Sequence, residues 1–161
     1  MSDADIDAPR VWKLMRDIEV CMFASRDGDV IRSRPLKAYA REDENAVYFL
    51  TLARGHKDEE IAGDASVCLS FAKPNTGKYL SVVGDARVSD NRAKIAELWE
   101  ASDTIWAKSE DDPDLRLITV TPHEAQFWEG PHGIVGTVGM IAAAATGGMP
   151  LLGENRKVQL D

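Results

Sequence analysis

Short apolar runs separated by turn residues recur along this chain and predict a protein built mainly of β-strands. Turn residues such as the Asp27-Gly28 pair inside 25–29 favour hairpins between consecutive strands. Further turns are expected at residues 41–45 and 73–77. The expected strands are 19–24, 30–40, 46–52, 66–72, 78–89, 116–121 and 123–128, the last two separated by Pro122.

Three helical segments interrupt the predicted strands. The first begins at Asp7-Ala8-Pro9, because aspartate can cap a helix and proline is tolerated in the first turn. A short helix is expected over 57–63, and a third runs from a cap at Asp90 to about residue 101. The apolar face of this third helix carries Ile95, Leu98 and Trp99, which places Trp99 in the core.

The order of these elements favours an antiparallel barrel with short α-helices. There are no internal repeats, and no strand–helix–strand rhythm with a glycine-rich loop after the first strand, so a doubly wound sheet is not expected. The length predicts a single domain over 1–161, with a C-terminal tail from about residue 133. A half-open barrel must cover its exposed strand edges, and dimerisation is one way to do so.

Composition narrows the possible functions. The formal net charge of −8 argues against broad binding to nucleic acid or to an anionic membrane. The polar N-terminus is not a signal peptide, and the Gly- and Ala-rich run 133–149 is too weakly apolar to span a membrane. Cys21 and Cys68 lie in apolar runs and are expected to be buried thiols, which fits a cytoplasmic protein.

The candidate chemistry lies in three short segments, because a phosphate group binds to positive charge, hydrogen-bond donors and helix N-termini. One strand carries Arg32, Ser33, Arg34, Pro35 and Leu36, and the next closes with Phe49, Leu50 and Thr51. His56 and Lys57 precede the short predicted helix, where the helix dipole adds to the charge of the lysine. Arg32 and Arg34 share one face of their strand, and the alternative interpretation is a solvated face with cationic residues.

The order and spacing of these segments resemble the FMN-binding split barrel of the pyridoxamine 5'-phosphate oxidase-like superfamily. Within it, the chain resembles the general stress protein 26 family over about residues 11–160. The segments that carry this second resemblance are 79–88, 90–99, 111–115, 120–128 and 152–158. His56 departs from the subfamily, which has proline or serine there, and the stretch 100–108 also differs. The resemblance therefore supports the cofactor more than any inherited substrate.

The resemblance implies a site for FMN between the subunits of a homodimer. Its ring would face the free backbone groups beside Pro35, and Thr51 and Lys57 would hold the phosphate. His56 could be a further phosphate donor or a solvent-facing turn residue. Trp106 would be a lid on the altered loop. Either Phe127 or Trp128 must face outward from its strand, and an outward Trp128 would be an interface or flavin-stacking residue.

Three functions remain open at the level of sequence. A flavin-dependent oxidoreductase would need no further catalytic residue, because the cofactor carries the redox chemistry, and a nicotinamide could be its electron donor. A non-catalytic flavin carrier or stress sensor would use the same pocket. A third reading replaces FMN by haem or by F420, which relatives use. His56, His123 and His132 do not have the spacing of a metal site, and there is no nucleophile elbow.

Overall fold

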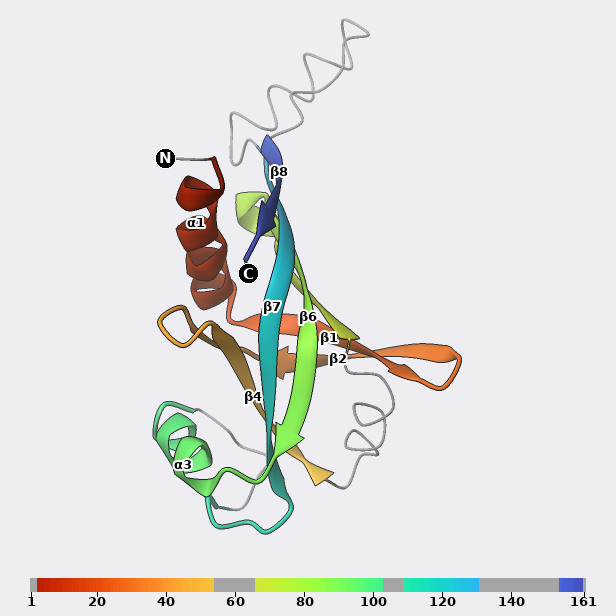
Figure 1. Cartoon of the computed structure of the whole chain (residues 1–161), viewed down its shortest axis with the longest axis vertical. Coiled ribbons are helices and arrows are strands. Elements are labelled where there is room, and N and C mark those ends of the chain that lie inside the picture. Colours follow the sequence, from red (N-terminus) through yellow and green to blue (C-terminus); the bar gives the residue numbers. More distant parts are fainter. Residues whose placement is uncertain (1–2, 54–65, 103–108, 131–153, 161) are drawn as a thin grey trace, which may run out of the picture.

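The computed structural model describes residues 3–53, 66–102, 109–130 and 154–160 (Figure 1). These residues form eight β-strands, two α-helices and one short 3-10 turn. The elements are α1 (Asp3–Ile18), β1 (Val20–Asp27), β2 (Val30–Lys37), β3 (Tyr39–Arg41), β4 (Ala46–Leu52), β5 (Ser66–Lys73), η2 (Pro74–Thr76), β6 (Lys78–Ser89), α3 (Arg92–Glu100), β7 (Leu115–Glu129) and β8 (Glu154–Gln159). The expected helix at 57–63 lies outside the described residues.

All eight strands belong to one antiparallel sheet, which confirms the mainly β architecture. Its order is β2-β1-β5-β6-β7-β4-β3, with β8 also paired to β7. The longest strands, β6 and β7, form the axis of the molecule, and the β1–β2 hairpin projects sideways from it (Figure 1). The sheet is curled but not closed: its edge strand β2 approaches β4 without pairing with it.

The inner face of the curled sheet holds the main hydrophobic core. Alternate residues of a strand face the same side, so Val67, Leu69 and Phe71 of β5 all point inward and are buried. The helix α1 closes this core with Val11, Leu14 and Met15. On the other side of β4, α3 packs Ile95 and Leu98 against a second cluster, which includes Tyr48, Leu50, Leu115 and Leu117.

Both described helices begin at other residues than the sequence predicts. The first starts at Asp3, and Pro9 lies inside it. Asp7 is not its cap: the buried Asp7 carboxylate accepts a hydrogen bond from Arg156 at 3.2 Å, and this ion pair ties α1 to β8. For α3 the cap is Asn91 rather than Asp90, because the Asn91 side chain accepts the Lys94 N–H at 3.1 Å. No described helix is long and apolar enough to cross a membrane.

Two strand predictions are corrected by the sheet. The expected strand 30–40 divides at Ala38 into β2, which pairs with β1, and β3, which pairs with β4. The expected break at Pro122 does not occur, because β7 forms a β-bulge there, where the ladder is interrupted and a proline without an N–H group is tolerated. Gly84 there pairs with Pro122 and Val83 with Glu124, so His123 is the extra residue. The tail also contributes a strand, β8, that the sequence does not predict.

Replacement of Gly84 by alanine should destabilise the fold strongly. A Cβ atom at this position would lie 2.4 Å from the Thr121 carbonyl oxygen, which is backbone and cannot move aside without disturbing the bulge. We expect a loss of about 3 kcal/mol in the free energy of unfolding, measured by urea denaturation. Gly28→Ala is the matched control, because Gly28 has a φ of +61° but no atom within 4 Å of its Cβ position. It should cost about 1 kcal/mol, and equal losses for the two variants would refute the steric explanation.

Candidate functional site

Arg34 is held in place from β1, the partner strand of β2. The hairpin register pairs Arg34 with Phe23, so the guanidinium lies over the Phe23 ring at 5.6 Å from its centroid. Its Nη2 atom donates a hydrogen bond to the Ser25 Oγ atom at 2.7 Å. The arginine is half-buried while Ser25 is fully buried, so the charged group stands at the edge of the core.

The Phe23 ring also joins this arginine to β4. Phe23 and Phe49 meet edge to face, with their ring centroids 5.2 Å apart and an interplanar angle of 77°. Thr51 follows two residues after Phe49 on the same face of β4 and is fully buried. The strands that carry Arg34 and Thr51, β2 and β4, are not hydrogen-bonded to each other, although they approach each other. They are brought together across the core, through Phe23.

The remaining candidates on β2 and β4 differ in exposure. Leu36 and Leu50 are buried, so any ligand contact there would come from the backbone. Ser33 and Pro35 are exposed on the opposite face of β2 from Arg34. Arg32 lies farther out along the hairpin, where its Nε atom donates to the Asp27 carboxylate at 2.7 Å and both side chains are largely exposed.

Three predicted site residues, His56, Lys57 and Trp106, lie outside the described residues, and their roles stay predictions. Trp128 is described: it is 37% exposed, while its neighbour Phe127 is buried. The expectation that one of these two aromatic residues faces outward is confirmed, and Trp128 is the outward one. The register places it opposite Tyr79 of β6, another exposed aromatic residue.

The two cysteines have different environments. Cys21 is buried in the core, as expected, and burial, followed by the nearby Cys68, raises the pKa of its thiol to about 12. A thiol with this pKa stays protonated at neutral pH and packs as a small apolar group. Cys68 is only half-buried, with its Sγ atom 3.5 Å from the Ser81 Oγ atom, so the prediction of full burial is wrong for it. Among the described residues, no cluster of His, Cys, Asp and Glu could hold a metal ion.

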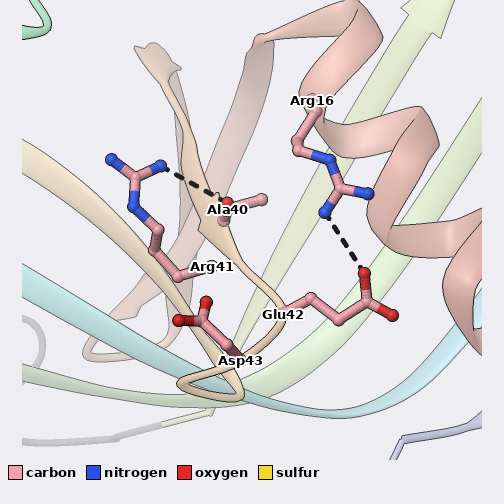
Figure 2. Close-up of a pocket in the computed structure, with 5 residues that line it drawn as sticks. All are labelled: Arg16, Ala40, Arg41, Glu42 and Asp43. Atoms are coloured by element: carbon pink, nitrogen blue, oxygen red, sulfur yellow. Dashed lines mark hydrogen bonds and ion pairs between the residues drawn. The ribbon is translucent and has the colours of Figure 1, made fainter.

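A surface hollow of about 600 Å³ lies elsewhere, between the end of α1 and the turn after β3 (Figure 2). Arg16, Ala40, Arg41, Glu42 and Asp43 line it. Arg16 lies 3.4 Å from the Glu42 carboxylate, and the guanidinium of Arg41 points away from this pair (Figure 2). Two arginines and two carboxylates give this lining no net charge, and no residue predicted for the phosphate site belongs to it. The hollow therefore differs from the site around Arg34.

Sequence reasoning missed Phe23 and Ser25, which hold Arg34. The sequence assigns Ser25 to a hairpin turn over 25–29, whereas the structure extends β1 to Asp27 and leaves only Gly28 and Asp29 in the turn. The signal was present in the Gly28-Asp29 pair, because glycine followed by aspartate also favours a two-residue hairpin turn, whereas a turn over Asp27-Gly28 would pair Phe23 with Arg32. The turn at Gly28-Asp29 sets the register that pairs Phe23 with Arg34.

Comparison with known proteins supports the fold. Residues 7–150 match the family described as "Pyridoxamine 5'-phosphate oxidase like". No curated protein matches the chain. Among solved structures, a general stress FMN/FAD binding protein from Xanthomonas citri is similar, with 19% identity, a TM-score of 0.70 and coverage of 81% of this chain and 93% of that one. General Stress Protein 26 from Bacillus anthracis str. Sterne shares 16% identity with a TM-score of 0.66, and the match covers 74% and 92% of the two chains.

A third solved relative is a pyridoxamine 5'-phosphate oxidase-related, FMN binding protein from Nostoc punctiforme PCC 73102. It has 19% identity, a TM-score of 0.57 and coverage of 80% and 85% of the two chains. The sheet described above, curled but left open between β2 and β4, is the split-barrel architecture expected from the sequence. The chain belongs to the pyridoxamine 5'-phosphate oxidase-like family.

Proposed function

We propose that this protein binds FMN beside the place where β2 and β4 approach each other. The observation that carries the proposal is the position of Arg34, held by Ser25 and Phe23 at the rim of the core, with Phe49 and Thr51 reached through the same aromatic ring. Two of the similar structures are named for FMN binding, which supports the same cofactor here.

In this proposal two sets of residues hold different parts of the cofactor. Arg34 and the backbone beside Pro35 orient the ring and ribityl part, while Thr51, His56 and Lys57 hold the phosphate. Bound FMN supplies the redox chemistry, and the protein binds it, orients it and sets its potential. A guanidinium donor near the N1 and O2 atoms of the ring would favour the reduced, negatively charged flavin.

We propose a flavin-dependent oxidoreductase as the activity, with a nicotinamide as a possible electron donor. Steady-state oxidation of NADH or NADPH, faster with the holoprotein than with free FMN, would support it. A bound flavin that does not turn over would instead favour a carrier or stress sensor. The absorption spectrum of the purified protein separates FMN from haem and from F420, because the three chromophores absorb differently.

Arg34→Ala tests the ring side of the site. If the guanidinium donates to the flavin ring, its loss should weaken FMN binding about tenfold or more and lower the flavin's reduction potential by about 30 mV for each 1.4 kcal/mol. Fluorescence titration gives the affinity, and a dye-coupled redox titration gives the potential.

Arg32→Ala is the control for this experiment, because Arg32 lies on the same strand but pairs with Asp27 on the exposed hairpin. It should leave both quantities unchanged. A loss of affinity in Arg34→Ala without a change in potential would indicate that Arg34 contacts the phosphate rather than the ring. No change in either quantity would show that Arg34 is not part of the flavin site.

Lys57→Ala tests the phosphate side, on the evidence of the sequence alone. A hydrogen bond between charged groups contributes about 1.5–3 kcal/mol, so FMN affinity should fall roughly 10- to 150-fold. Riboflavin lacks the phosphate, and its affinity should hardly change. Equal losses for the two ligands, measured by the same titration, would show that Lys57 does not contact the phosphate.

We also propose that the protein works as a homodimer, with the flavin at the interface. The described helices leave uncovered the outer face of β1, β5, β6 and the part of β7 beyond its bulge, and several large apolar side chains are exposed on it. They are Val20, Met22, Tyr79, Val83 and Trp128, between 37% and 50% exposed. The registers place them on one side of the sheet, and a group of large exposed apolar side chains on one face is typical of a surface that another chain covers.

Val83→Lys should disrupt this dimer, because it places a charge in the middle of the outer face. The matched control is Val30→Lys, since Val30 is similarly exposed (51% against 44% for Val83) but lies on the opposite face of the sheet. Light scattering at micromolar concentration should give a dimer for the wild type and for Val30→Lys, and a monomer for Val83→Lys. A wild-type monomer that still binds FMN tightly would overturn the homodimer.

A further inference from the structure

Two segments that carry the family resemblance, 90–99 and 111–115, have no role in the site as described so far. The structure joins them through one side chain. From the start of α3, Arg92 donates through its Nη1 atom to the Asp112 carbonyl at 2.9 Å. Its Nη2 atom donates to the carbonyls of Leu115 at 3.2 Å and Pro113 at 3.4 Å. One guanidinium therefore holds three backbone carbonyls of the 109–115 loop.

Further contacts support both ends of this interaction. The Asp90 carboxylate lies 2.6 Å from the Nε atom of Arg92 and fixes the plane of the guanidinium. Lys94 ties α3 to the turn before β4, with its Nζ atom 3.1 Å from the Glu44 carboxylate. The loop is also folded on itself, because the N–H groups of Asp114 and Leu115 donate to the side chain and the carbonyl of Asp112.

The loop ends beside the part of the site assigned to the phosphate. The Asp114 carbonyl accepts the N–H of Ala53 at 2.8 Å. One step further, Leu52 pairs with Leu115, and Thr51 pairs with Arg116. The position of the end of β4, which carries the buried Thr51, therefore depends on the position of a loop that Arg92 holds.

We propose that Arg92 is a positioning residue for the phosphate end of the flavin site. It acts through the 109–115 loop on Ala53 and Thr51, and its role does not require contact with the ligand. This inference rests on the proposed binding of FMN. A planar guanidinium has several donors in a fixed geometry, whereas a lysine offers a single charged centre. The geometry of Arg92 should therefore matter more than its charge.

The experiment compares Arg92→Gln and Arg92→Lys with the wild type in two measurements. The first is the affinity for FMN and for riboflavin, by fluorescence titration of the full chain. The second is the rate of amide hydrogen exchange at Ala53 without flavin. For both variants we expect FMN affinity to fall about tenfold, riboflavin affinity to change less than twofold, and the Ala53 amide to exchange faster.

Arg156→Gln is the matched control. Arg156 also forms an ion pair with a carboxylate, that of Asp7, but it ties α1 to β8, which pairs with the other end of β7 from the 109–115 loop (Figure 1). This variant should lose thermal stability, because it loses the ion pair with the buried Asp7, but its ratio of FMN to riboflavin affinity and its exchange at Ala53 should match those of the wild type. A change in the ratio as large as that of Arg92→Gln would show that general destabilisation explains the result.

The remaining outcomes test the positioning role of Arg92 and the proposed function separately. Full recovery in Arg92→Lys would mean that the charge acts at a distance on the phosphate, and would overturn the positioning role. Unchanged exchange at Ala53 in both variants would also overturn it, even where flavin binds. Failure of the wild type to bind FMN would instead overturn the proposed function, and the role of Arg92 toward the phosphate with it. The exchange measurement distinguishes the two failures, because it needs no ligand.

Discussion

The long antiparallel pair of β6 and β7 is the interaction on which the rest of the structure depends. It runs from Lys78 opposite Glu129 to Ser89 opposite Leu117. The other strands extend the sheet from this pair: β5, β1 and β2 follow in turn beyond β6, while β4 and β8 both pair with β7 and β3 pairs with β4. On the far side of β7, β4 pairs with one half and β8 with the other. The bulge at Gly84 lies between these halves, where two backbones approach so closely that no side chain fits. A bulge increases local twist, which helps a single sheet to curl into an open barrel.

The curl creates the candidate site, because it brings together two strands that the sheet itself keeps apart. In a flat sheet, β2 and β4 would be separated by four strands. Here Phe23 contacts Phe49 on one side and the Arg34 guanidinium on the other. These contacts belong to the hydrophobic core, so the position of the charged group is stabilised by the same packing that stabilises the fold. A residue held in this way loses little conformational freedom when a ligand binds.

The sequence predicts local features well where one pattern decides them. The bounds of β4 and β6 follow from their apolar runs and turns, and the outward direction of Trp128 follows from strand alternation next to the buried Phe127. Prediction from the sequence fails where pairing with another strand determines the structure. The strand expected over 30–40 divides because its first part pairs with β1 and its last part with β4, and β8 forms because it pairs with the end of β7 that β4 does not reach. The support of Arg34 by Ser25 was hidden for a related reason, since a small change in the turn length reassigns the residue from turn to strand.

The acidic balance of the chain explains why such local support matters. With 27 acidic and 19 basic residues, the protein as a whole repels a phosphate, so attraction must come from a few cations held at short range. Several described cations are instead used to join elements, such as Lys94 between α3 and the β3–β4 turn and Arg156 between β8 and α1. Arg92 also joins two elements, but it binds backbone carbonyls instead of a side-chain carboxylate, and it therefore fixes a loop rather than a single residue. In a protein of this charge, the geometry that aligns neutral donors such as Thr51 contributes to anion binding alongside the few cations that reach the ligand.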